Sequence, residues 1–284
     1  MERILILGDM HVGSIFALAP LESIPQDRKN IFHDWVYSKW KDLVKQYDNL
    51  NYLILVGDIA DGSQIKSLGI DALYTDTDVQ VREASRLLKM IKVKSQIFGI
   101  NGSGYHGGEG QGTNIDRRIT EEIGGIYKGN IFEFDIKDER IQVSHGGGGT
   151  SIVGLHSYIL REIALSKQDA QKRKTKAPTI LVRGHQHRMF SIQDDAGVYG
   201  VLNGCWQYTT PYMVKKSANI TPSIGATMIE VDDNNTKIFR IEYPIPEEVR
   251  QGMIGFETLE YKRKEKRNKD NLECLKETLK GKSL

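Results

Sequence analysis

The sequence of 284 residues has few cysteines and no long hydrophobic run. Cys205 and Cys274 are too few for a disulfide framework in a chain of this size, which favours a reduced, intracellular protein. No segment approaches the ~20 consecutive apolar residues of a membrane-spanning helix. The first apolar run, residues 4–7, is soon followed by Asp9 and His11, which does not resemble a signal peptide. We therefore expect a cytoplasmic protein that does not associate with membranes.

The sequence also lacks a strong charge of one sign. Its 39 basic and 37 acidic residues give a net charge of +2, which argues against nucleic-acid binding by the whole surface. The basic residues are concentrated at the end, because residues 261–284 carry nine basic and four acidic side chains. We predict one domain over residues 1–260 and a basic, helical C-terminal tail over 261–284. A solvated end is the simplest interpretation of the tail, and a polyanion-binding arm or a dimerisation helix are the alternatives.

Internal repeats are absent, and hydrophobic periodicity indicates the secondary structure. Helical spacing predicts helices near residues 27–47, 84–91, 115–123 and 155–170. Short runs rich in β-branched residues predict strands over 4–7, 52–56, 97–100, 131–136, 141–144, 179–182, 190–193, 198–202, 226–231 and 237–243. Strands alternate with helices in the first hundred residues, whereas strands dominate the second half. Two sheets packed face to face with helices outside would accommodate both halves.

Polar side chains able to bind metal follow several of the predicted strands directly. They lie in four short motifs, Gly8-Asp9-Met10-His11, Gly57-Asp58-Ile59-Ala60-Asp61, Ser144-His145-Gly146-Gly147 and Gly184-His185-Gln186-His187. The carboxyl ends of strands in open α/β sheets border the crevice where binding sites form, so these motifs can converge. Each motif alone is weak evidence. Four of them, each at a strand end, indicate a common site.

The donor set indicates the kind of metal. Imidazole and carboxylate groups without cysteine suit Mn, Fe, Zn or Ni better than calcium, which prefers oxygen ligands. The candidates outnumber the ligands of one ion, and a carboxylate can bridge, so we expect two divalent ions, as in sites that act on phosphate esters. The six candidates are Asp9, His11, Asp58, His145, His185 and His187. Arg183 and Arg188 flank the last pair and could contact phosphate, although solvent exposure is the simpler interpretation.

In this order the four motifs resemble the signature of calcineurin-like metallophosphoesterases, over residues 4–187. The resemblance implies a four-layered α/β/β/α sandwich of two mixed sheets flanked by helices. It also implies the metal ligands: Asp9, His11 and His187 for the first ion, Asp58 as the bridge, and His145 and His185 for the second ion.

One motif departs from the family pattern. The family usually has Gly-Asn-His-Asp or Gly-Asn-His-Glu after the third strand, with the asparagine on the second metal and the histidine assisting catalysis. This chain reads Ile100-Asn101-Gly102-Ser103-Gly104-Tyr105-His106. Ser103 or Asn101 could supply an oxygen ligand, water could fill the position, or His106 could itself be a ligand. Our candidate role for His106 is that of the general acid that protonates the leaving oxygen.

The predicted function is a metal-dependent phosphodiesterase in which a hydroxide bridging two metal ions attacks phosphorus. We expect Mn as the metal, with Fe, Zn and Ni as alternatives, and nucleic acid or nucleotides as the substrate. A phosphomonoesterase, including a protein phosphatase, uses a compatible metal core. A catalytically inactive metal-binding scaffold is the third alternative. Oligomerisation through the C-terminal tail remains open.

Overall fold

The computed structural model describes residues 1–63, 69, 71–106, 114–146, 154–216, 221–233 and 235–256. The predicted tail over residues 261–284 lies outside the described residues. None of the described helices is long and apolar enough to cross a membrane.

The first sheet has six strands in the order β11-β10-β1-β2-β3-β4. Its strands β1 to β4 are parallel, whereas β10 pairs antiparallel with both β1 and β11. This sheet is therefore mixed. Its strands are β1 (Glu2–Leu7), β2 (Leu50–Leu55), β3 (Val93–Gly99), β4 (Ile126–Tyr127), β10 (Gly225–Val231) and β11 (Thr236–Glu242).

The second sheet has five strands in the order β5-β6-β7-β9-β8. Strands β6, β7 and β9 are parallel, and β5 and β8 pair antiparallel at the two edges. The strands are β5 (Ile131–Ile136), β6 (Glu139–Ser144), β7 (Ile180–Arg183), β8 (Phe190–Gln193) and β9 (Tyr199–Leu202).

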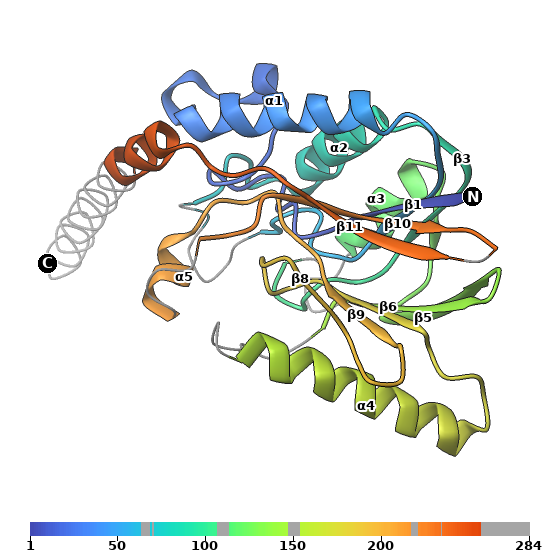
Figure 1. Cartoon of the computed structure of the whole chain (residues 1–284). Coiled ribbons are helices and arrows are strands. Elements are labelled where there is room, and N and C mark those ends of the chain that lie inside the picture. Colours follow the sequence, from blue (N-terminus) through green and yellow to red (C-terminus); the bar gives the residue numbers. More distant parts are fainter. Residues whose placement is uncertain are drawn as a thin grey trace, which may run out of the picture.

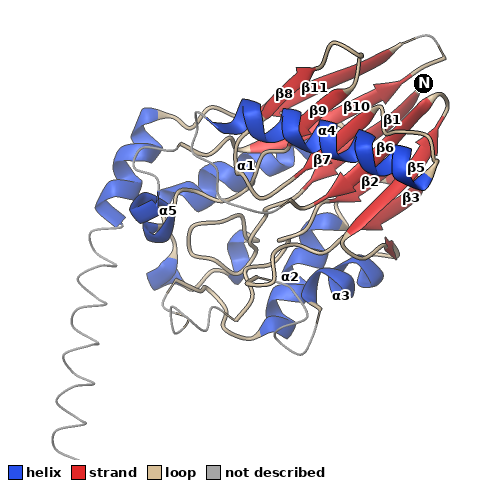
Figure 2. Cartoon of the chain, turned by 90° about the horizontal axis from the view of Figure 1, so that it is seen from below, coloured by secondary structure: helices blue, strands red, loops and turns tan. Residues whose placement is uncertain are grey.

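Helices cover the outer faces of both sheets (Figure 1). Helices α1 (Ile31–Gln46), α2 (Thr77–Leu88) and α3 (Ile115–Glu122) lie over the first sheet, and α4 (Leu155–Arg173) lies over the second. Figure 2 shows α4 crossing the strands of the second sheet. Residues 247–256 and α5 (Pro211–Lys216) are also helical.

The side chains of β1 explain why the layers stack in this order. Alternate residues of a strand face opposite sides of its sheet. Ile4 and Ile6 belong to the core between the two sheets, whereas Leu5 and Leu7 pack in the core beneath the helices. All four are fully buried. The predicted four-layered α/β/β/α sandwich of two mixed sheets is confirmed.

Strand β4, helix α5 and the helical residues 247–256 were not predicted, and two helices start at other residues than expected. Helix α2 was expected near residues 84–91 but spans Thr77–Leu88. Strand β4 has two residues and α5 has six, too few for a periodic pattern. Helix α1 was expected from about residue 27, but residues 26–28 form a separate 3-10 turn. The Asn30 side chain accepts from His33 N, and His33 Nδ1 accepts from Asn30 N, forming a capping box that starts α1 at Ile31.

Candidate metal centre

The loops that follow β1, β2, β6 and β7 bring all six predicted metal ligands together. Two groups of three side chains form, and within each group the potential ligand atoms lie within 4.8 Å of one another. One group contains Asp9, His11 and His187. The other contains Asp58, His145 and His185. These are the two sets that the family resemblance implies, with Asp58 as the residue expected to bridge them.

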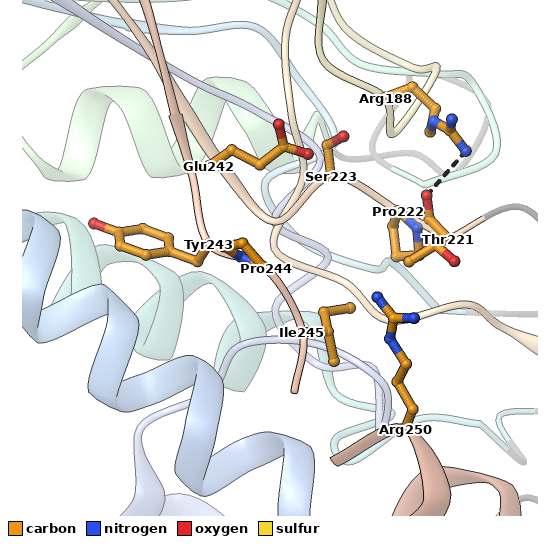
Figure 3. Close-up of a pocket in the computed structure, with 9 residues that line it drawn as sticks. All are labelled: Arg188, Thr221, Pro222, Ser223, Glu242, Tyr243, Pro244, Ile245 and Arg250. Atoms are coloured by element: carbon orange, nitrogen blue, oxygen red, sulfur yellow. Dashed lines mark hydrogen bonds between the residues drawn. The ribbon is translucent and has the colours of Figure 1, made fainter. Parts of the chain in front are cut away.

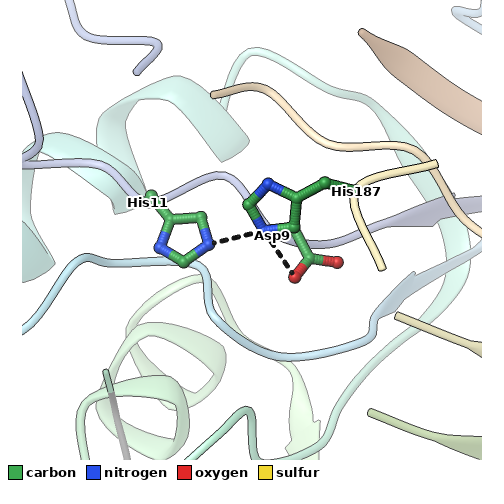
Figure 4. Close-up of side chains that lie close together, drawn as sticks. All are labelled: Asp9, His11 and His187. Atoms are coloured by element: carbon green, nitrogen blue, oxygen red, sulfur yellow. Dashed lines mark hydrogen bonds and ion pairs between the residues drawn. The ribbon is translucent and has the colours of Figure 1, made fainter. Parts of the chain in front are cut away.

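The first group is buried and closely packed (Figure 4). His11 Nε2 lies 3.1 Å from His187 Nε2, and His187 Nε2 lies 3.4 Å from Asp9 Oδ1. Two imidazoles and a carboxylate aimed at one point form a suitable donor set for a divalent cation.

In the second group, a backbone contact orients His145. Its Nδ1 lies 2.7 Å from the carbonyl oxygen of Val56, so Nδ1 donates this hydrogen bond when the ring is neutral. That leaves Nε2 as the ligand atom, 3.0 Å from Asp58 Oδ2. The His185 ring lies 5.2 Å from the His145 ring, centroid to centroid.

Asp58 lies between the two groups. It shares the second group with His145 and His185, and a third group with His11 and His106. His145 Nε2 also lies 3.9 Å from Asp9 Oδ1, so one imidazole approaches the carboxylates of both principal groups. The six side chains therefore form one continuous cluster rather than two separate sites.

The backbone of this cluster is strained. Seven non-glycine residues among those described have positive φ, and five of them are Asp9, His11, Asp58, His185 and His187. This left-handed region is uncommon for side chains with a Cβ and costs free energy, so it persists where the surrounding structure enforces it. The strain is concentrated at the predicted ligands, as is typical of functional sites.

The cluster's negative charge is balanced by histidines. Burial acts to raise the pKa of Asp58, but His145, His106 and His11 outweigh it and hold that pKa far below its usual range. Burial likewise acts to lower the pKa of His145, but Asp58 and Asp9 raise it to about 10. Within the described part of the chain, no lysine or arginine pairs with Asp9 or Asp58. Imidazoles alone therefore face the two buried carboxylates, and a donor set of carboxylates and imidazoles fits divalent metal ions.

The loop after β3 carries Asn101, Ser103 and His106, whose roles were left open, and directs their side chains differently. The Asn101 amide points away from the cluster, donating to Asn130 Oδ1 at 2.8 Å and accepting from Asn114 Nδ2. Ser103 is directed toward the cluster, because its Oγ donates to Asp58 Oδ2 at 3.0 Å and its N–H to Asp58 Oδ1 at 2.7 Å. Of the two oxygen ligands considered, only Ser103 is brought to the predicted metals.

His106 lies beside the first group. Its ring centroid is 4.4 Å from that of His11, and its Nδ1 is 2.9 Å from the carbonyl oxygen of Asp61. Burial acts to lower the pKa of His106, but hydrogen bonding to Asp61 and the charge of Asp58 raise it to about 9. The side chain retains 20% exposure, so it borders solvent. This position is compatible with either a general acid or a ligand.

Asp61 lies between two histidines. Its Oδ1 is 3.3 Å from His11 Nδ1 and 3.4 Å from His106 Nδ1. A carboxylate on Nδ1 fixes the ring orientation and leaves Nε2 directed at the cluster. This geometry agrees with the expectation that Asp61 orients a ligand rather than being one.

Sequence reasoning missed Asp116, in the first turn of α3. Its carboxylate accepts from the backbone N–H groups of Ile59, Gly102 and Asp58 at 3.0, 2.8 and 3.3 Å. Burial raises the pKa of Asp116 to about 6, with Asp58 adding to the effect. An acidic residue at a helix start is common for electrostatic reasons alone, so the sequence carried no signal for this role.

A glycine allows the two loops held by Asp116 to meet. Gly57 has a φ of +86°, and a Cβ added there would lie 2.3 Å from Gly102 Cα. A side chain at position 57 would therefore push the Asp58 loop away from Ser103.

Arg183 was wrongly expected either to contact phosphate or to face solvent. It is buried beneath α4, where its Nε donates to Glu162 Oε2 at 3.2 Å and its Nη2 to Gln142 Oε1 at 2.7 Å. It therefore joins the second sheet to α4. Arg188 is partly exposed and donates to the carbonyl oxygen of Thr221 at 3.1 Å.

No protein-family model matches the chain. No curated protein matches it either. Solved structures similar to it include the zinc complex of Vps29 from Entamoeba histolytica, which is 12% identical with a TM-score of 0.41, covering 85% of this chain and 99% of that one.

A structure described as an archaeal phosphodiesterase is 12% identical with a TM-score of 0.41, covering 84% of this chain and 98% of that one. The phosphoesterase YfcE from E. coli is 12% identical with a TM-score of 0.40, covering 80% and 88%. At this identity the likeness concerns the overall arrangement alone, so a function for this chain rests on its own side chains.

Proposed function

We propose that this chain is a calcineurin-like, metal-dependent phosphoester hydrolase that binds two divalent ions. The observation that carries the proposal is the joining of two ligand groups through Asp58 and Asp9 in one buried, strained cluster. The order of the four sequence motifs and the four-layered fold support it. Asp9, His11 and His187 would hold one ion, His145 and His185 the other, and Asp58 would bridge them.

Two divalent ions held by these residues would neutralise charge on a phosphoryl group and would lower the pKa of bound water, so that a nucleophile could form near neutral pH. The chain's own residues provide the rest of the chemistry. Val56 and Asp61 fix the rings of His145 and His11, and Asp116 fixes the loops that carry Asp58 and Ser103. These contacts hold the ligand atoms in place before substrate arrives.

Proton delivery to the leaving group is assigned to His106. Its Nδ1 contacts Asp61, and this hydrogen bonding favours the protonated imidazole that a general acid requires. It borders solvent, which gives a route for reprotonation after each turnover.

The proposed reaction is phosphodiester hydrolysis, with nucleic acid or nucleotides as the substrate class and Mn as the first metal to test. The basic residues between 261 and 284 support a polyanionic substrate, because lysine and arginine contacts to phosphates strengthen nucleic-acid binding. A phosphomonoesterase would use the same cluster with a different substrate pocket.

Paired assays test this proposal. Metal-free protein reconstituted with Mn should hydrolyse bis-p-nitrophenyl phosphate, and removal of the metal with chelator should abolish the activity. Turnover of p-nitrophenyl phosphate alone would indicate a monoesterase instead. If neither ester is hydrolysed although two ions are bound, the chain is a metal-binding scaffold and the proposed activity is wrong.

A further inference from the structure

A cavity outside the metal cluster is lined by two arginines. Its volume is about 410 Å³, and its walls come from residues 221–223, residues 242–245, Arg188 and Arg250 (Figure 3). In Figure 3 both guanidinium groups are directed toward Thr221 and Pro222, whereas the Tyr243 ring points away. The cavity therefore presents two positive charges from separate elements.

Neither arginine has a carboxylate partner among the described residues. Arg188 makes one hydrogen bond, from Nη1 to the carbonyl oxygen of Thr221. Arg250 Nε is buried and lacks a hydrogen-bond partner in the described structure. Arg250 itself is half-buried, and a desolvated N–H without an acceptor is unfavourable, so this donor can be satisfied by a bound acceptor. Glu242 also lines the cavity but is exposed and pairs with neither guanidinium.

The cavity is connected to the candidate metal centre through the backbone. Arg188 directly follows His187 in the sequence, and Ser223 N–H donates to the carbonyl oxygen of His187 at 2.9 Å. One wall of the cavity is thus hydrogen-bonded to a residue proposed to bind metal. A group held in the cavity would lie beside that segment of the site.

We infer that this cavity is a phosphate-binding subsite, separate from the metals, in which Arg188 and Arg250 are the recognition residues. Guanidinium groups match oxyanions geometrically and form charge-assisted hydrogen bonds with them. The choice of phosphate among oxyanions rests on the proposed function, but the existence of an anion site does not. The phosphate could belong to a second position of a substrate strand or nucleotide, or be free phosphate.

The test measures binding of inorganic phosphate to metal-free protein by calorimetry at fixed ionic strength. Chelator prevents binding at the metal centre, and this readout does not depend on hydrolysis. Loss of one charge-assisted contact is worth about 1.5–3 kcal/mol, so Arg250→Gln and Arg188→Gln should each weaken binding by roughly tenfold or more. Glu242→Gln should strengthen binding, because it removes the negative charge at the cavity.

Arg240→Gln is the matched control, since Arg240 is an exposed arginine of β11 that does not line the cavity. It should leave phosphate affinity unchanged. Arg250→Lys retains the charge, so its phosphate affinity should lie between those of the wild type and Arg250→Gln. This conservative variant also keeps the test valid if Arg250→Gln fails to fold. Absence of phosphate binding in the wild type, or equal weakening by all three arginine-to-glutamine variants, would overturn the inference.

Kinetics then identify the source of the phosphate. If the subsite binds a second phosphate of the substrate, Arg250→Gln should raise KM at least tenfold more for a dinucleotide with a terminal phosphate than for the same dinucleotide without it. If the subsite binds free phosphate, the two KM values should change in the same ratio while the calorimetric loss remains.

Discussion

At the scale of single residues, the least predictable feature is His106. The family pattern places a histidine directly after the metal-binding asparagine, whereas here it comes three residues after Ser103. The loop nevertheless returns its ring to 4.4 Å from that of His11. A longer loop can thus restore the histidine to the site, but its position depends on contacts with Asp61 that no local sequence pattern encodes.

Replacement of His106 by alanine separates its two possible roles. As the general acid, His106→Ala should retain both metals yet lose about 10²- to 10⁴-fold in rate on alkyl phosphodiesters, and far less on p-nitrophenyl esters, whose leaving group needs little protonation. Metal analysis and the two rates measure this. A variant with a single ion per chain and equal losses on both substrates would make His106 a ligand instead.

At the scale of secondary-structure elements, segments with a clear hydrophobic pattern could be predicted from the sequence. Features that depend on contacts between distant segments could not. Every predicted strand is present, because each contains a short run rich in β-branched residues, as Ile4–Leu7 of β1 does, and these runs pack into a buried core. Asp116 was not identifiable, since its role depends on α3 lying against the loops after β2 and β3. The burial of Arg183 likewise follows from the packing of α4 and not from its own segment.

The N-terminus of α3 should control the geometry of the metal centre. Asp116→Asn would turn an amide N–H toward backbone donors, so we expect a stability loss of about 1–3 kcal/mol and at least tenfold weaker metal binding. Denaturant unfolding and metal titration measure the two effects.

Glu121→Gln is the control on the same helix. Glu121 is exposed and pairs with Arg117 one turn away, so its loss should cost less than about 0.5 kcal/mol and leave metal affinity intact. Equal effects of the two variants would show that Asp116 does not position the loops.

The start of α1 should make stability dependent on pH. Burial lowers the pKa of His33 to about 4, from an ordinary value near 6.5, and its neutral Nδ1 accepts the Asn30 N–H. Between pH 6.5 and 4 the unfolded chain therefore binds more protons, and stability falls as the pH is lowered, by about 3 kcal/mol in all.

His33→Gln keeps a neutral acceptor at the third helical position and should reduce this pH dependence. Unfolding curves between pH 7 and 4 measure it. The exposed His156 gives the control variant, His156→Gln, which should retain the wild-type slope. If His33→Gln also retains the wild-type dependence of stability on pH, proton uptake by other groups causes the loss of stability at low pH.

At the scale of the whole molecule, the fold and the convergence of six candidate ligands followed from strand ends and motif order. The concentration of basic residues in the C-terminal tail could also be read from the sequence, but the role of the tail could not.

Removing residues 262–284 should leave hydrolysis of small chromogenic esters intact and weaken nucleic-acid binding most at low salt, where phosphate contacts contribute most. Binding titrations at several salt concentrations measure this, and loss of small-ester activity would instead assign the tail a structural role.

The central claim is that one buried cluster holds two divalent ions bridged by Asp58. Asp58→Asn tests it, because asparagine tolerates the positive φ found there. The change removes the charge and turns one of the two oxygens that accept from Ser103 into an amide donor. The decisive measurement is the metal content per chain of wild type and variant, taken together with turnover of bis-p-nitrophenyl phosphate. The account predicts two ions in the wild type, weakened binding at both positions in Asp58→Asn, and loss of most activity. Near-normal turnover by Asp58→Asn, or an active wild type with one ion, would contradict it.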